Sequence, residues 1–352
     1  MRKTIDSLKG IGILGVVLVH YSIKASNDLI SGIVFNGARG VQLLFIINAY
    51  LIFTSLSKIQ LNKTSILKWW KAKFIRLIPL YWFYTIIHLM VFGLGERYYL
   101  GTLPKVSILN ILCNLSFLHG FHPYYINSIN ANWFMADLAI FYLFAPFLYK
   151  IINSLEKSIL ALLIVTPIGY ILMHFALKLP ILQVEGIWED YVKILSFPSE
   201  FPIILLGIFA FFAYKEKNIR GKDVIAIVGL IFSCFCMISL FLKKDYFILF
   251  NNIFSFGFLL MIVFVSQMIK PLKLICNGFF AAIGKHSYGI YLSHIIILKY
   301  INMFLGEFRN EKIIDIIGYI LLVLAAYIVS VLSENIIERN AIKLLNRRED
   351  NG

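Results

Sequence analysis

Charge is what this chain lacks most. Charged residues make up 15% of its 352 residues, hydrophobic residues make up 60%, and the mean hydropathy is +0.81. A soluble domain carries roughly 25% charged residues. The apolar excess excludes an ordinary soluble enzyme, and it indicates a chain whose solvent is a lipid bilayer.

Acidic residues are scarcer than basic ones, at 19 against 33, so the net charge is +14. In a soluble protein this excess would favour nucleic acid as a partner. Here the lysines and arginines lie mainly between apolar runs, where cations fix the orientation of membrane segments. We therefore expect a lipid bilayer, and no nucleic acid, as the partner of this chain.

Cysteine is also rare. The cysteines are Cys113, Cys234, Cys236 and Cys276. None of them belongs to a C-x-x-C pair or has a histidine nearby at ligand spacing. Neither a disulfide framework nor a zinc site is indicated by this pattern. We predict buried reduced thiols and no metal.

Apolar runs of about 17 to 25 residues are long enough to cross a bilayer as helices. Ten such runs predict an all-α polytopic membrane protein: 9–26, 40–57, 77–95, 132–149, 158–178, 200–214, 222–242, 246–268, 277–300 and 312–333. An amphipathic stretch at 105–121 would make eleven, but eleven spans would put a basic loop outside. We therefore expect 105–121 to be external, re-entrant or interfacial.

Basic linkers set the predicted topology, because such linkers face the cytoplasm. They lie at 58–76, 214–222, 270–273 and 343–348. Ten spans with both termini cytoplasmic satisfy all of them. The first run is not followed by a convincing cleavage site, so we interpret it as a retained helix and not as a signal peptide.

The chain is predicted to hold one membrane-embedded domain over 1–345 and a short cytoplasmic tail at 346–352. It would be a multi-pass protein of the inner (plasma) membrane. Two long loops, 96–131 and 179–199, would lie outside, and both are rich in aromatic and polar residues. Loops of this length are usually functional.

The stretch “LKGIGILGVVLVHYSI” places a histidine inside an apolar run. In a helix, Lys9 and His20 are close to three turns and roughly 16 Å apart, so they share a face. An ionisable residue within a membrane is costly and usually faces a cavity or a partner. The alternative is a neutral histidine that is bonded to a neighbouring helix.

Seven stretches occur in order along the chain: “IDSLKGIGILGVVLVHYS”, “GARGVQLLFIINAYLIF”, “KAKFIRLIPLYWFY”, “SFLHGFHPYYINSINANWFMADLAIFYLFAPFLY”, “FPSEFPIILLGIFAFFA”, “IGKHSYGIYLSH” and “SENIIERNAIKLL”. This series resembles the integral-membrane acyltransferase family three, whose members O-acylate bacterial surface polysaccharides and related acceptors. The resemblance runs from about residue 4 to residue 345. Each motif alone is weak, and the ordered series is specific.

The resemblance implies a cytoplasmic acetyl-CoA, or a similar acyl-CoA, as cosubstrate and no permanently bound cofactor. Such a donor is a polyanion, and fixed cations at the inner face would hold it. The family's basic positions fall on Lys9, where arginine is commoner, and on Lys73 and Arg76. Arg39 is a further predicted donor-binding residue. The alternative for these cations is that they only orient the spans.

His20 is the residue that the resemblance makes catalytic. It would act either as the base for a sugar hydroxyl or as the nucleophile that holds the acyl group, and the sequence leaves both open. The family usually has a glutamate where this chain has Leu138. Asp137, one position earlier, and Glu200 are the candidate carboxylates that would orient His20 in catalysis. The alternatives are that this chain dispenses with such an acid, and that Glu200 is an interfacial residue at a helix start.

Further motif positions are predicted to line the cavity or contact the acceptor. They are Asn48 (where the family usually has serine), His119, Trp133, Ser287, Tyr288, Tyr291 and His294. Aromatic and amide groups suit sugar recognition, and an interfacial aromatic belt has the same composition.

The resulting hypothesis is a bacterial membrane O-acetyltransferase that acylates a cell-surface polysaccharide or glycolipid. The alternative is a transporter or flippase for a lipid-linked oligosaccharide or a small metabolite. Transporters usually show paired repeats with broken helices, and no such repeat is evident. A non-catalytic scaffold would leave His20 and His294 without a role.

Overall fold

The structure is a computed structural model that describes residues 1–23, 28–95, 106–121, 132–178, 191–215, 247–306, 308 and 312–343. Every regular element in these ranges is a helix. The longer helices are α1 (Arg2–Tyr21), α2 (Asp28–Asn36), α3 (Gly40–Leu56), α4 (Lys63–Phe92), α5 (Ile108–Leu115), α7 (Trp133–Ile151), α8 (Leu155–Leu177), α10 (Phe197–Lys215), α12 (Phe247–Ile269), α13 (Gly278–Lys285), α14 (Ser287–Leu305) and α15 (Lys312–Ser333). Four short turns accompany them: η1 (Gly37–Arg39), η3 (Leu118–Phe121), η5 (Tyr191–Leu195) and η7 (Glu334–Glu338).

Eight helical stretches in the described ranges are long and apolar enough to cross a membrane. They correspond to eight of the ten predicted spans, which confirms an all-α polytopic membrane protein. The predicted span at 222–242 lies outside the described residues, and α12 holds a shorter apolar helix, Phe256–Ile269. The cytoplasmic position of the termini stays a prediction.

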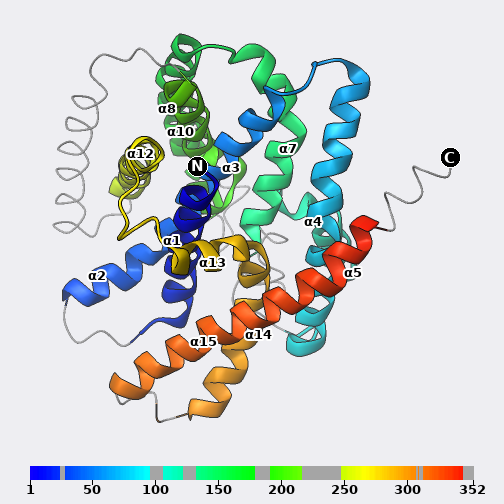
Figure 1. The fold of residues 1–352 in the computed structure, drawn as a ribbon, viewed down its shortest axis with the longest axis vertical. Helices are drawn as coiled ribbons and strands as arrows, with labels where there is room; N and C mark the ends of the chain where they lie inside the picture. Colours follow the sequence, from blue (N-terminus) through cyan, green and yellow to red (C-terminus); the bar gives the residue numbers. More distant parts are fainter. Residues whose placement is uncertain are drawn as a thin grey trace.

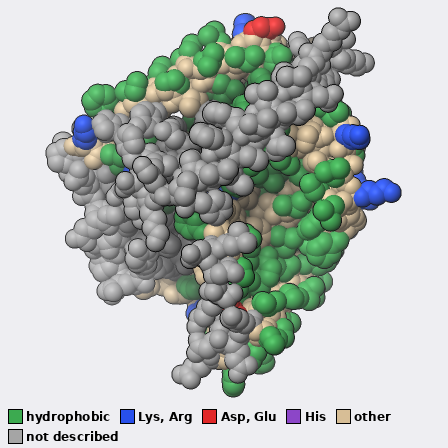
Figure 2. Space-filling view, turned by 90° about the vertical axis from the view of Figure 1, so that its left-hand side faces the viewer, with side chains coloured by type: hydrophobic (Ala, Val, Ile, Leu, Met, Phe, Trp, Pro, Cys, Tyr) green, Lys and Arg blue, Asp and Glu red, His purple; other side chains and the backbone are tan. Residues whose placement is uncertain are grey.

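The outer surface of the bundle is apolar, as a lipid-facing surface requires. Figure 2 shows hydrophobic side chains over much of the described face, with lysine and arginine confined to its periphery. Helix α8 is the extreme case, because its large side chains, such as Leu163 and Leu172, point outward. Helix α5 buries its polar side chains and exposes apolar ones, unlike a helix of a soluble protein: Asn110 and Asn114 are buried while Leu112 is exposed. Whether 105–121 is external, re-entrant or interfacial stays a prediction.

Two predicted boundaries differ from the structure. The basic linker at 58–76 was expected as a loop, but α4 begins at Lys63, where the Asn62 side chain accepts a hydrogen bond from the Ser65 amide at 2.9 Å. Basic side chains within 63–76 therefore lie on helical faces. The single span expected at 277–300 is divided at His286 into α13 and α14.

Helix α1 lies in the middle of the bundle, with α8, α10 and α12 on one side of it and α14 and α15 on another (Figure 1). Glycines allow its neighbours to approach very closely. A Cβ at Gly10 would collide with the Phe280 carbonyl of α13, and a Cβ at Gly12 would meet the Gly40 carbonyl of α3. Small residues at helix crossings are typical of membrane bundles. These contacts fix α1, and with it the placement of His20.

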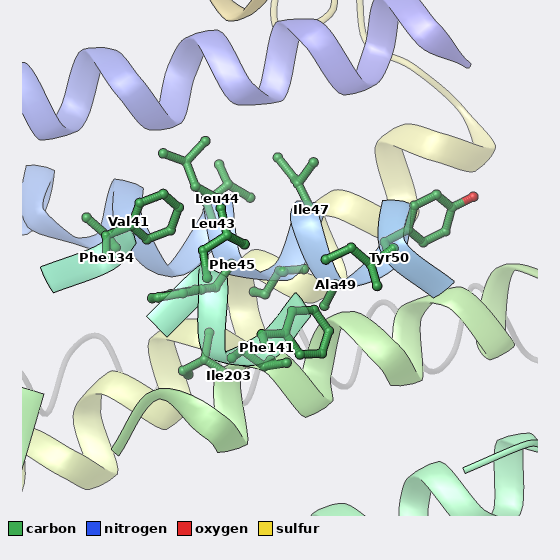
Figure 3. Close-up of a cluster of buried hydrophobic side chains, with 14 of the residues drawn as sticks. Val41, Leu43, Leu44, Phe45, Ile47, Ala49, Tyr50, Phe134, Phe141 and Ile203 are labelled. Atoms are coloured by element: carbon green, nitrogen blue, oxygen red, sulfur yellow. The ribbon is translucent and has the colours of Figure 1, made fainter. Parts of the chain in front are cut away.

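The apolar core includes buried residues of α1 itself and extends around α3, which packs against α7 and α10. Phe45 packs on Phe134 with ring centroids 4.6 Å apart, and Ile203 of α10 approaches the same cluster (Figure 3). Phe141, further along α7, is also buried there. The cluster consists of apolar side chains, and several polar groups described next lie on the same helices.

Candidate active site

The structure brings the first and last histidines of the motif series together. His20 of α1 and His294 of α14 are 274 positions apart in the chain, yet Nε2 of His294 lies 3.2 Å from Nδ1 of His20. Their ring centroids are 5.0 Å apart. Nδ1 of His20 also lies 2.8 Å from the Val16 carbonyl, and Nδ1 of His294 lies 2.6 Å from the Tyr291 carbonyl.

The two rings differ in accessibility. His294 is completely buried, whereas the side chain of His20 is exposed although helices surround it. Of the two rings, that of His20 is therefore the one with accessible surface. The pair combines one reactive group with one supporting group.

A cluster of positive charge lies about three helical turns away from His20 along α1. Lys73 of α4 is close enough to Lys9 and to Arg76 for their charges to repel one another. The Lys73 ammonium lies 5.3 Å from the centre of the Trp69 ring. The predicted donor-binding residues Lys9, Lys73 and Arg76 thus form one cation cluster, which is suited to a polyanion.

Arg39, the fourth predicted donor-binding residue, lies in a different place. It is buried in η1, and its charge acts on Glu200 of α10. Gln42 of α3 donates a 2.7 Å hydrogen bond to Oε1 of Glu200. Asp137 of α7 lies close to Glu200. These four residues are a second polar cluster, the carboxylate cluster.

The carboxylates are fully enclosed by protein. Asp137 is 0% exposed and Glu200 is 1% exposed, and both Asp137 oxygens and Oε2 of Glu200 have no hydrogen-bond partner among the described residues. Tyr291 lies near Asp137 of this cluster, and its ring centroid is 5.8 Å from that of His294. In the described chain, no hydrogen bond joins either carboxylate to His20 or His294.

Two of the other predicted site residues bond to backbone carbonyls on helices. Asn48 donates to the Leu44 carbonyl at 2.9 Å within α3. The Tyr288 hydroxyl donates to the Leu77 carbonyl of α4 at 2.6 Å. Trp133 packs at the start of α7, and Ser287 begins α14 directly after His286. Contact of any of them with an acceptor stays a prediction.

His119 belongs to a buried network and not to an open surface. Its ring nitrogens face the carbonyls of Cys113 and Asn132, and burial lowers the pKa of His119 to about 4. The Asn132 side chain in turn donates to the Tyr81 hydroxyl and to Asn114. This network was not predicted from the sequence, although Asn110 and Asn114 on the amphipathic stretch were a signal for it.

Among the residues that the structure describes, no three His, Cys, Asp or Glu side chains are grouped as metal ligands would be. The titratable groups that the described residues bring together are the histidine pair, the cation cluster and the buried carboxylates. The fold is that of a polytopic membrane protein, and the candidate site is a pair of histidines on two of its helices.

The comparison with known families agrees with this class. A family model described as an acyltransferase domain matches residues 2–334, so the chain belongs to the integral-membrane acyltransferase family three. Proteins of Staphylococcus aureus strains COL, MSSA476 and MRSA252, each named “Putative O-acetyltransferase”, are 23% identical to it over 382 residues. No solved structure matches the chain.

The alignments cover 98% of this chain and 58% of each of these relatives. The chain therefore spans little more than half the length of the curated proteins that it resembles. The similarity covers all of the predicted site residues, since these fall between positions 9 and 294 within the family match.

Proposed function

We propose that this protein transfers an acetyl group, or a similar acyl group, from cytoplasmic acyl-CoA to a hydroxyl of a cell-surface polysaccharide or glycolipid, and that it does so in the inner membrane of a bacterium. The observation that carries the proposal is the exposed His20 on a helix that also bears Lys9 of the cation cluster. One helix thus connects a binding site for a polyanion with a reactive imidazole.

The cation cluster provides the donor end of this site. The phosphates of a CoA thioester carry several negative charges, which would pair with the neighbouring cations Lys73 and Arg76. The thioester is at the far end of a long, flexible arm. Lys9 and His20 lie roughly 16 Å apart along α1, so the phosphates and the thioester would occupy opposite ends of one passage.

His20 supplies the proton transfer. In the general-base form, its imidazole takes the hydroxyl proton while the acceptor oxygen bonds to the acyl carbon; the carbon–sulfur bond then breaks and the thiolate of CoA receives the proton. In the covalent form, the acyl group is held on the ring before it moves to the hydroxyl. Both forms need an unprotonated ring nitrogen that faces the substrate.

The proposed function is tested with the purified protein and with intact cells. The protein in lipid nanodiscs is supplied with acetyl-CoA and surface glycan, and release of free CoA thiol is followed. Mass spectrometry of the surface polysaccharide, from cells with and without the gene, should differ by one acyl group. We expect His20→Ala to abolish both signals, while Ser22→Ala, an exposed change at the end of the same helix, leaves them unchanged. Acetylation by a well-inserted His20→Ala protein would refute the assignment.

A further inference from the structure

The hydrogen-bond contacts of His20 and His294 indicate which nitrogen of each ring carries the hydrogen. Nδ1 of His294 lies 2.6 Å from the Tyr291 carbonyl oxygen, which can only accept, so Nδ1 carries the hydrogen. His294 is 0% exposed, and a buried cation without a counter-charge is costly, so the ring is neutral. A neutral imidazole has one N–H, and therefore Nε2 of His294 is an acceptor.

The same reasoning then applies to His20. Its Nδ1 faces two acceptors, the Val16 carbonyl at 2.8 Å and Nε2 of His294 at 3.2 Å. Nδ1 of His20 must therefore carry the hydrogen, which it shares between these two acceptors. Two partners from different helices give the same tautomer. The lone pair of the exposed His20 ring is consequently on Nε2.

We propose that Nε2 of His20 is the atom that reacts, and that His294 is a positioning residue that holds His20 in the required tautomer. This inference rests on the proposed function and deepens it. Nε2 accepts the proton of the acceptor hydroxyl as the new carbon–oxygen bond forms, and Nε2 returns that proton to the CoA thiolate. His294 keeps its own proton throughout, and its lone pair stabilises the positive charge that His20 carries between the two steps.

His294 thereby has the role that a carboxylate has in many catalytic triads, where an acceptor at Nδ1 fixes the imidazole. The carboxylate cluster does not compete for this role. Within the part of the chain that the structure describes, Asp137 lacks a hydrogen-bond partner and Glu200 bonds to Gln42. The family's usual glutamate is absent at Leu138, but His294 still holds the ring of His20.

The reacting nitrogen is identified directly by affinity alkylation. The full-length protein in nanodiscs is treated with bromoacetyl-CoA and hydrolysed, and the two isomers of carboxymethylhistidine are separated by amino-acid analysis. Peptide mass spectrometry locates the label in the chain. We expect the Nε2 isomer at His20, and protection by excess acetyl-CoA. The Nδ1 isomer at His20, or a label at His294, would overturn the proposed tautomer.

Failure of the proposed function gives a different result in the same experiment. A protein that binds acetyl-CoA but acquires no label at His20 would show that His20 does not meet the thioester at all. That outcome contradicts the function and the inference together, whereas the wrong isomer contradicts the inference alone.

Kinetics of two variants test the role of His294. His294→Leu removes the acceptor, whereas the amide oxygen of His294→Gln can take the place of Nε2. Loss of the partner of a metal-bound histidine typically costs about 10- to 100-fold, and we expect a similar range for a neutral imidazole partner, below the roughly 10⁴-fold of a triad carboxylate. We expect a loss of kcat in that range for His294→Leu, a KM for acetyl-CoA close to the wild-type value, and recovery of most of kcat in His294→Gln.

A structural role for His294 predicts a different pattern, in which stability and KM change along with kcat and glutamine gives no rescue. Thermal unfolding in detergent and acetyl-CoA binding are therefore measured for each variant. Wild-type kcat in a folded His294→Leu protein would overturn the positioning role. If His294→Leu does not fold, the isomer found in the alkylation experiment decides the proposal.

Discussion

Removal of one cation from the Lys9–Lys73–Arg76 cluster should weaken donor binding by an amount that follows from its environment. A hydrogen bond to a charged group contributes about 1.5–3 kcal/mol. Arg76 is exposed, so water screens it and the lower end applies, which is about tenfold in Kd. Lys73 is half-buried beside Trp69, so its removal should approach the upper end, about 100-fold.

The assay is equilibrium binding of acetyl-CoA to the purified protein, with Arg76→Ala and Lys73→Ala compared with Lys68→Ala. Lys68 is an exposed cation on the same helix, and its removal changes the net charge by the same amount. We expect wild-type Kd for Lys68→Ala. Higher salt should reduce the difference between Arg76→Ala and wild type more than it reduces the difference for Lys73→Ala, because salt screens exposed charges more strongly.

Two results would contradict this reasoning. If Arg76→Ala and Lys73→Ala both bind acetyl-CoA with unchanged Kd while inserting normally, these cations serve topology alone. If Lys68→Ala weakens binding as much as Arg76→Ala does, the effect comes from the net charge of the protein and not from a local site.

Three other perturbations test the packing and the buried polar groups. Gly284→Ala should destabilise the protein by about 1–3 kcal/mol in thermal unfolding, because the new Cβ collides with the Asp6 carbonyl of α1. Stability should fall between about pH 6.5 and pH 4, by up to about 3 kcal/mol, because the unfolded state protonates His119 in this window while the folded state, with its pKa lowered to about 4, does not. Asp137→Asn should leave kcat close to wild type, because Asp137 makes no hydrogen bond to His20 among the described residues.

Each of these has a control or a contradicting outcome. Gly278→Ala should be harmless, since nothing lies within 4 Å of a Cβ there. His119→Gln should remove the acid-dependent loss of stability, and an unchanged pH profile would place that loss elsewhere. A folded Asp137→Asn protein without activity would restore Asp137 as a catalytic acid.

The membrane architecture was largely predictable because it depends on a local property. A helix must be apolar for about 20 residues to cross a bilayer, and that length is visible in any sequence window. The helix boundaries were harder to predict from the sequence. The cations before Arg76 read as a loop, yet Asn62 caps a helix that carries them directly into the span. The break at His286 was also missed, although Gly284, Lys285 and Ser287 interrupt the apolar run there.

The site was predictable where one helix determines it and unpredictable where several helices meet. Helical periodicity alone places Lys9 and His20 on one face. No periodicity relates Arg39 to Glu200, or Gln42 to Glu200, because helix crossings bring these residues together. Arg39 was therefore grouped with the cytoplasmic cations on the basis of its charge, whereas the structure places it beside a buried acid.

Among the described residues, the side chain that contacts His20 is a histidine, whereas the sequence pattern suggested a carboxylate. An orienting acid was expected, since carboxylates have that role in triads, and Leu138 then appeared to be a defect. Within a membrane bundle an ionised carboxylate is expensive to bury, whereas a neutral imidazole costs less and still presents a lone pair. His294 supplies that lone pair from α14 at 3.2 Å. A neutral acceptor is thus the more economical way to fix a catalytic tautomer in a medium of low dielectric constant.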